Sequence, residues 1–195
     1  MYKPAEDSFL LAEQIKLYLA GFSKRELSGL NVLDMGAGSG IQANICIDSG
    51  VLKNNILNVD IDKEAIESLK SKKYNAVQSN LFSEIKGIFN LIIFNPPYLP
   101  EVKHDKKKDT TGGKTGDETI FKFLKQAKSH LKKNGVILLL TSSFTPMKRI
   151  NKLIKKLNMK KKKLAEKNIF FEKLFVFSIS FLSNEPEQVQ SQLKQ

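Results

Sequence analysis

The segment Asn95-Pro96-Pro97-Tyr98 combines an amide, two rigid prolines and an aromatic ring directly after an apolar run. That run, Leu91-Ile92-Ile93-Phe94, predicts a buried strand, and open parallel sheets bind ligands beyond the carboxyl ends of their strands. The prolines fix φ and lack a backbone N–H, so the segment leaves the sheet and offers an amide side chain, carbonyls and a ring face. Such a segment suits a flat group that has N–H to donate. A proline turn with a capping Asn is the simpler interpretation.

A glycine-rich segment, Asp34-Met35-Gly36-Ala37-Gly38-Ser39-Gly40, lies between a predicted strand and a predicted helix. Glycines let a backbone turn tightly and approach a ligand closely. Asp34 could hold a cationic amine, and Asp60 ends the next predicted strand, where an acid can accept ribose hydroxyls. A purely structural tight turn is the alternative. Joined to Asp60 and Asn95, however, the segment predicts a ligand that carries a ribose.

The rest of the chain alternates between predicted helices and strands. Helices are predicted at 5–19 and 41–48, after the N-caps Asp62 and Thr145, and along Ile120, Leu124, Ala127 and Leu131 as far as Asn134-Gly135. Strands are predicted at 31–33, 56–60, 76–80, 91–94 and 136–140, followed by an antiparallel pair at 160–171 and 173–182. This order predicts one α/β domain with a mostly parallel sheet.

Composition narrows the class of protein. The 195 residues suffice for one domain with its own core, and hydrophobic and charged residues make up an ordinary 41% and 27%. No apolar run approaches the ~20 residues of a membrane span, and acidic residues near the start argue against a signal peptide. A single cysteine, Cys46, predicts a core position and a reducing compartment, and His104 and His130 lack partners at metal-ligand spacing. We therefore expect a cytoplasmic protein without metal or membrane contact.

The charge balance is strongly basic, with a net charge of +12 and a pI of about 9.6. Almost all of the excess is lysine, since Arg25 and Arg149 are the only arginines. Lysine suits a general attraction to nucleic acid or ribonucleoprotein better than the reading of base edges. A merely solvated surface is an equal alternative. The run Lys160 to Lys163 is expected to be a strand edge whose charges block edge pairing.

Together these segments resemble the class I S-adenosylmethionine-dependent methyltransferases. Within them the chain is similar to the HemK/PrmC type of protein glutamine N5-methyltransferase, in the archaeal and eukaryotic branch that methylates translation release factors. The resemblance covers nearly the whole chain. Tyr2 to Leu11 resembles that branch's opening motif, and Asp34 to Gly40 its cofactor loop. Asn95 to Tyr98 resembles its catalytic motif, and Thr111 to Glu118 its loop beside the substrate.

The resemblance implies a Rossmann-like fold: a seven-stranded, mostly parallel sheet with helices on both faces and a C-terminal antiparallel hairpin. One domain would span 1–183, with an N-terminal helical motif at 1–25, and a polar tail would follow at 184–195. The implied cofactor-binding residues are Ser8, Asp34, Gly36, Gly38, Gly40, Asp60, Ile61, Asn80, Leu81 and Asn95. The implied substrate-binding residues are Asn95, Pro96, Pro97, Tyr98, Gly112 and Gly113, of which Asn95, Pro96 and Tyr98 would be catalytic.

The implied reaction moves a methyl group from S-adenosylmethionine to the glutamine of the Gly-Gly-Gln tripeptide in a class 1 release factor. In our hypothesis the Asn95 oxygen and the Pro96 carbonyl accept the two amide hydrogens while Tyr98 packs on the flat amide. Family members usually carry an acid where Asn80 stands, so a weaker hydrogen bond to the adenine amino group is expected. Eukaryotic members work with a small zinc-binding activator subunit, which predicts a heterodimer here, and the basic surface could contact the ribosome or RNA.

Two other functions stay open at this point. The Asn-Pro-Pro-Tyr motif is shared with methyltransferases that act on exocyclic amino groups of bases, so N6-adenine methylation of RNA or DNA is the first alternative. The short chain argues against it, because little remains to form a target-recognition domain. The second alternative is a cofactor-binding partner of an RNA assembly that performs no reaction, and the intact Asn95 argues against that.

Overall fold

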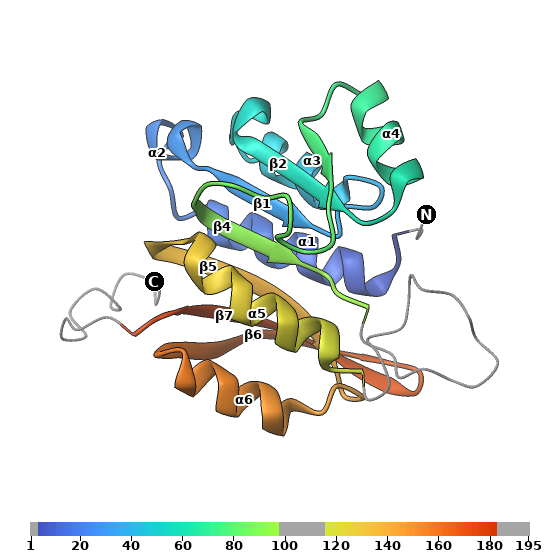
Figure 1. The fold of residues 1–195 in the computed structure, drawn as a ribbon, viewed down its shortest axis with the longest axis vertical. Helices are drawn as coiled ribbons and strands as arrows, with labels where there is room; N and C mark the ends of the chain where they lie inside the picture. Colours follow the sequence, from blue (N-terminus) through green and yellow to red (C-terminus); the bar gives the residue numbers. More distant parts are fainter. Residues whose placement is uncertain (1–3, 98–115, 183–195) are drawn as a thin grey trace.

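The computed structural model describes residues 4–97 and 116–182. Within them one seven-stranded sheet has the order β3-β2-β1-β4-β5-β7-β6 (Figure 1). The five strands β1 to β5 run parallel, and β7 pairs antiparallel with both β5 and β6. The strands are β1 Val32–Met35, β2 Ile56–Asp60, β3 Ala76–Gln78, β4 Phe89–Phe94, β5 Leu131–Ser142, β6 Met159–Ile169 and β7 Glu172–Phe181. The predicted mostly parallel sheet with a closing hairpin is therefore confirmed.

Helices cover both faces of the sheet, as predicted (Figure 1). They are α1 Glu6–Leu19, α2 Lys24–Gly29, α3 Ile41–Asp48, α4 Lys63–Ser71, α5 Glu118–His130 and α6 Met147–Lys156, with a short 3₁₀ turn, η1, at Lys53–Asn55. One apolar core joins α1 and α3 to the sheet, and a second joins α5 and α6 to the opposite face. Because the end of β4 is buried on both sides, Leu91 to Phe94 form a continuous apolar run rather than an alternating one. Strand β1 is equally buried but includes the charged Asp34.

The order of the strands fixes where a ligand can bind. The chain runs from β1 outward to β2 and β3, and then returns to place β4 on the other side of β1. A crevice forms at such a switch point, outside the carboxyl ends of the strands. The register pairs Met35 with Phe94, so the residues that follow, Gly36 and Asn95, emerge side by side. Topology alone thus brings the two sequence motifs together.

Three local details differ from the sequence predictions. The helix expected to reach Asn134-Gly135 ends at His130, because Leu131 already pairs with Phe89 as the first residue of β5. Thr145 does not cap α6; its hydroxyl accepts the backbone N–H of Ser142 at 3.2 Å instead. Helix α2, with its Ser-x-x-Glu capping box, was not predicted, since six residues carry little periodicity.

The C-terminal hairpin forms one border of the sheet. Strand β6 is the outer strand and carries the lysine run, while β7 lies between β5 and β6 with Leu174, Val176 and Ile179 fully buried. Ser142 at the end of β5 pairs with Leu174 near the start of β7. The turn between β6 and β7 therefore lies at the same end of the sheet as the crevice. No helix in the described part of the chain is long and apolar enough to cross a membrane.

Candidate active site

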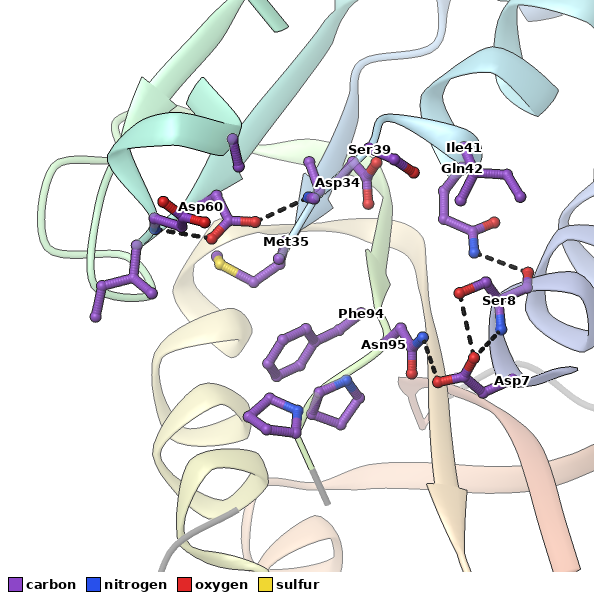
Figure 2. Close-up of a pocket in the computed structure, with 18 of the residues that line it drawn as sticks. Asp7, Ser8, Asp34, Met35, Ser39, Ile41, Gln42, Asp60, Phe94 and Asn95 are labelled. Atoms are coloured by element: carbon purple, nitrogen blue, oxygen red, sulfur yellow. Dashed lines mark hydrogen bonds between the residues drawn. The ribbon is translucent and has the colours of Figure 1, made fainter. Parts of the chain in front are cut away.

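A cavity of about 580 Å³ opens at the switch point. It is bounded by the ends of β1, β2 and β4, the first turns of α1 and α3, the start of α5 and the β6–β7 turn. Cavities that enclose small molecules or cofactors usually measure about 300–1,000 Å³, so this one has the size for such a ligand. Figure 2 shows Asp60 on one side of the cavity and Asp7 and Ser8 on the other, with Phe94 and Asn95 between them.

The glycine segment is held in a shape that other residues would resist. Gly36, Gly38 and Gly40 all have positive φ, and Gly40 forms the left-handed N-cap of α3. A Cβ on Gly40 would lie 2.8 Å from Cδ2 of Leu69, so a larger residue would have to displace that side chain and also adopt an unfavourable positive φ. Asp60 pins the segment, because its Oδ2 accepts the Gly38 N–H at 2.8 Å and its Oδ1 accepts the Asp62 N–H at 2.9 Å. Each carboxylate oxygen can accept a further hydrogen bond from a ligand.

Asn95 is held by a residue that the sequence did not single out. Its Nδ2 donates to Oδ2 of Asp7 at 3.1 Å, while Oδ1 of Asp7 accepts the N–H and the hydroxyl of Ser8 at 2.6 and 3.2 Å. A carboxylate only accepts hydrogen bonds, so the amide nitrogen of Asn95 must face Asp7 and its oxygen must face away. That oxygen, Oδ1, is buried and has no hydrogen-bond partner. Asp7 thus orients a free acceptor (Figure 2).

Several residues that line the same cavity carry unpaired oxygens. Within the described residues, buried side-chain oxygens without a hydrogen-bond partner that belong to lining residues are Oδ2 of Asp34, Oε1 of Gln42, Oδ1 of Asn95 and Oε2 of Glu172. Buried polar atoms are almost always paired in folded proteins, because an unmade hydrogen bond costs about 1–3 kcal/mol. Four acceptors around one cavity indicate a ligand, or a pair of ligands, rich in N–H donors.

Asp34 is the most perturbed of these groups. Burial, and then the charge of Asp60, raise the pKa of Asp34 to about 8, although its carboxylate accepts a backbone hydrogen bond from Ala43. A neighbouring cation would lower that pKa and stabilise the charged carboxylate. The environment of Asp34 therefore fits the predicted role of holding a cationic amine.

The opposite end of the cavity suits a flat, less polar group. Ile61 lies on the rim with 64% of its surface exposed, and Leu81 adopts a positive φ of 53° that turns the chain past the cavity. Ser79 supports that turn, since its hydroxyl donates to the Leu81 carbonyl at 2.8 Å and accepts the Glu84 N–H at 3.1 Å. Asn80 is exposed on the same rim.

The structure places most of the predicted site residues on this cavity. Those that line it are Ser8, Asp34, Gly36, Gly38, Asp60, Ile61, Asn80, Leu81, Asn95, Pro96 and Pro97. Gly40 stands behind the lining as the N-cap of α3. Tyr98, Gly112 and Gly113 lie outside the described residues. Just after the undescribed residues 98–115, the buried Asp117 is held by an ion pair with Nε of Arg149 at 3.3 Å.

Several lining residues were missed, among them the polar residues Asp7, Gln42, Lys122 and Glu172. Asp7 lies in the segment Tyr2 to Leu11 that resembles the family's opening motif, but nothing local in the sequence indicates that its carboxylate contacts Asn95. Gln42 donates to the Ser8 carbonyl at 3.0 Å, a contact across 34 residues that no local pattern indicates. Among the described residues no cluster of His, Cys, Asp and Glu could hold a metal; Cys46 is buried in the core, and His130 stacks on Phe82.

Comparisons with known proteins agree with this geometry. The family model "Methyltransferase small domain" matches residues 13–171. A Methanocaldococcus jannaschii protein, provisionally named a protein N5-glutamine methyltransferase, is 34% identical over 91% of this chain and 90% of its own. The mouse methyltransferase HEMK2 is 29% identical over 72% of this chain and 71% of its own.

Solved structures agree on the fold. One of them is the E. cuniculi Mtq2–Trm112 complex, which is described as responsible for the methylation of the eRF1 translation termination factor. A chain of that complex superposes with a TM-score of 0.74 at 21% identity, covering 93% of this chain and 98% of the other. The family match and the archaeal relative lead to one conclusion: this chain belongs to the small-domain methyltransferases and, among them, to the protein N5-glutamine methyltransferases.

Proposed function

We propose that this methyltransferase transfers a methyl group from S-adenosylmethionine to the side-chain amide of the Gly-Gly-Gln glutamine in a class 1 translation release factor. The observation that carries the proposal is the Oδ1 atom of Asn95, which is buried on the cavity wall, unpaired, and fixed in orientation by Asp7. A primary amide needs an acceptor of this kind. The name of the archaeal relative, a protein N5-glutamine methyltransferase, and the description of the Mtq2–Trm112 complex, responsible for the methylation of eRF1, support the same substrate class.

The cavity residues fit the cofactor. Oδ2 of Asp34 would accept from its ammonium group, and the backbone from Gly36 to Gly38 would follow its methionine portion, beside Ser8. Asp60 would accept the ribose hydroxyls, and Ile61 and Leu81 would pack on the adenine ring. Asn80 would accept the adenine amino group. The bound cofactor supplies a methyl group activated by a positively charged sulfur.

The protein's task is to make a weak nucleophile react. An amide nitrogen is poorly nucleophilic because its lone pair is delocalised into the carbonyl. Oδ1 of Asn95 and the carbonyl of Pro96 would accept the two amide hydrogens, which draws electron density onto the nitrogen and holds it in line for attack. Asp7 keeps Oδ1 of Asn95 pointed at the substrate, and Pro97 and Phe94 keep water away from the same wall.

Isotope transfer tests the acceptor directly. The purified protein is incubated with tritiated cofactor and one of three acceptors: a release factor, the same factor with its Gly-Gly-Gln glutamine changed to alanine, or total RNA and DNA. We expect label on the first alone, and mass spectrometry should place it on the glutamine. Label on the glutamine-free factor, or on nucleic acid only, would contradict the proposal.

Methylation of N6 of adenine is the second candidate. It is favoured by the lysines that face solvent on α6 and β6, and by the ability of Asn95 to grip any planar –NH2 group. The same isotope experiment separates the two candidates.

Partners and boundaries are part of the proposal. By analogy with the Mtq2–Trm112 complex, a small activator subunit would form a heterodimer with this chain. The family resemblance implies that this subunit binds zinc. Co-expression with such a subunit should raise yield or turnover. Contact with the ribosome or RNA through the lysine-rich surface, a single catalytic domain over 1–183 and a cytoplasmic location stay predictions.

A further inference from the structure

The turn of the β6–β7 hairpin carries two adjacent phenylalanines that face water. Phe170 is fully exposed and Phe171 is 93% exposed, and Phe144 nearby is 48% exposed. Scattered apolar side chains are normal on a surface, but aromatic rings clustered at one point usually mark an interaction site. The hairpin turn is seen in Figure 1 as the orange-red tip beyond β6 and β7.

These rings border a second, shallow cavity of about 530 Å³ that adjoins the active site. Phe144, Phe170 and Phe171 line it, together with Lys167 and Asn168. Glu6, Ile169 and Glu172 line both this cavity and the larger one. The two cavities therefore share a wall. A molecule that reaches from the active-site cavity past this wall enters the shallow cavity.

The hairpin turn is held in place by contacts with α1 and with Ser143, the residue after β5. Lys167 of β6 forms a salt bridge with Glu6 of α1. Ser143 and Lys173 exchange two hydrogen bonds: the Ser143 N–H donates to the Lys173 carbonyl at 2.8 Å, and the Lys173 N–H donates to the Ser143 hydroxyl at 3.1 Å. Aromatic side chains held on a fixed backbone lose little entropy on binding, which makes them effective anchors.

The shared wall also holds an unsatisfied acceptor. Oε2 of Glu172 is buried without a hydrogen-bond partner, and burial raises the pKa of this carboxyl. A backbone N–H from a chain that crosses the wall could pair with that oxygen. An apolar anchor and a buried acceptor thus lie beside each other at the mouth of the active site.

From this arrangement we infer that Phe144, Phe170 and Phe171, hereafter the aromatic tip, form the docking surface for the folded protein acceptor. The inference rests on the proposed function, because a glutamine that enters the cleft brings its own protein up to the cleft wall. A nucleic acid would be drawn instead to the lysines of β6 and α6. Two lysines that flank the tip in the sequence, Lys167 and Lys173, are already paired with Glu6 and Glu166. The acceptor should therefore present apolar side chains next to its glutamine.

The test compares a whole protein with a peptide. The double variant Phe170→Ser/Phe171→Ser is assayed on a full-length release factor and on a short peptide that contains Gly-Gly-Gln. Both side chains are exposed, so the variant should fold. We expect kcat/KM on the factor to fall about tenfold or more, mainly through KM, with activity on the peptide unchanged. The control is Leu52→Ser/Ile88→Ser, which removes two apolar side chains that are each 53% exposed and lie before β2 and β4 at the far end of the sheet.

Each other outcome has a distinct meaning. Equal activity of variant and wild type on the factor overturns the docking surface and leaves the proposed function standing. An equal loss on factor and peptide also overturns it, because the turn would then shape the cleft itself. A wild-type dimer that the variant converts to a monomer assigns the tip to a second copy of this chain and overturns the inference. Wild type that methylates neither factor nor peptide refutes the proposed function and the docking surface together.

Discussion

The two sides of the cavity are built in different ways. The cofactor side, defined here as Asp34, the glycine segment and Asp60, is held by contacts close in sequence: Gly38 and Asp60 are 22 residues apart. The acceptor side, defined as Asp7, Asn95 and Glu172, depends on distant contacts. Asp7 and Asn95 are 88 residues apart, and the salt bridge that supports the neighbouring turn joins residues 161 apart.

This difference matches what each side must do. The cofactor side is the strand–glycine–helix unit of a doubly wound fold, in which backbone shape does most of the binding. The acceptor side is assembled from the first turn of α1, the end of β4 and the start of β7, so its side chains can change without altering the sheet. Substrate choice should therefore reside in the acceptor side, and mutations on the two sides should separate turnover from cofactor affinity.

The largest effect should come from Asn95→Ala. It removes the oriented acceptor for the substrate amide, and we expect kcat to fall on the order of 10²- to 10³-fold. The dissociation constant of the cofactor, measured by calorimetry, should change little, because the buried acid and the glycine segment are untouched. Lost cofactor affinity together with near-normal turnover would assign Asn95 to the cofactor side instead.

Asp34→Asn should do the opposite. It removes the charged acceptor for the cofactor's amine, and we expect the dissociation constant to rise about 10- to 100-fold. The calorimetric titration used for Asn95→Ala measures it, and Asp48→Asn, a charge removed at the far end of α3, is the control.

The same variant should be more stable than wild type at alkaline pH. Asp34 has a folded pKa of about 8, above its ordinary value of 3.8. Its contribution to folding is therefore fully present below pH ~4 and is lost as pH rises through 8. Without cofactor, Asp34→Asn should gain on the order of 1–3 kcal/mol over wild type between pH 5.5 and pH 8.5, or several degrees in melting temperature. A difference in stability that does not depend on pH would show that Asp34 is ionised in the free protein.

The sequence predicted the cofactor side better than the acceptor side, and the separations above explain why. Asp62 was identified as an N-cap, and the helix 41–48 and the strand 56–60 have the predicted bounds, because capping and periodicity are local. Asp7 and Glu172 could not be assigned, since their partners are set by how α1 and the hairpin pack on the sheet. The family resemblance supplied the acceptor motif, but it did not indicate what orients Asn95.

Asp7→Asn should give a smaller but more specific effect. The Asp7 carboxylate serves Ser8 with one oxygen and Asn95 with the other, whereas an amide has a single acceptor and must abandon one of them. If the new amide at position 7 still accepts the hydrogen bonds from Ser8, its NH2 group faces the NH2 group of Asn95. The amide of Asn95 then rotates, which turns its oxygen away from the substrate. We expect kcat to fall about tenfold with cofactor affinity near wild type.

Glu13→Gln is the matched control for that variant, because it removes one negative charge from the exposed face of the same helix. It should retain wild-type kcat. A purely structural role for Asp7 would lower the melting temperature and leave kcat per folded molecule unchanged, so both quantities are measured. Equal losses of kcat in Asp7→Asn and Glu13→Gln would point to the overall charge of α1 rather than to the orientation of Asn95.

The smallest effect should come from Asn80→Asp, on the rim of the cofactor side. An ionised carboxylate accepts a stronger hydrogen bond than an amide carbonyl does, so cofactor affinity should rise. Asn80 is exposed, and water weakens the difference, so we expect the dissociation constant of the cofactor to fall by only about two- to fivefold. Turnover at saturating cofactor should not change, because Asn80 does not approach the acceptor side. A change in kcat without a change in affinity would mean that the two sides are coupled through the turn at Leu81, whose positive φ of 53° makes it the most constrained non-glycine position on that rim.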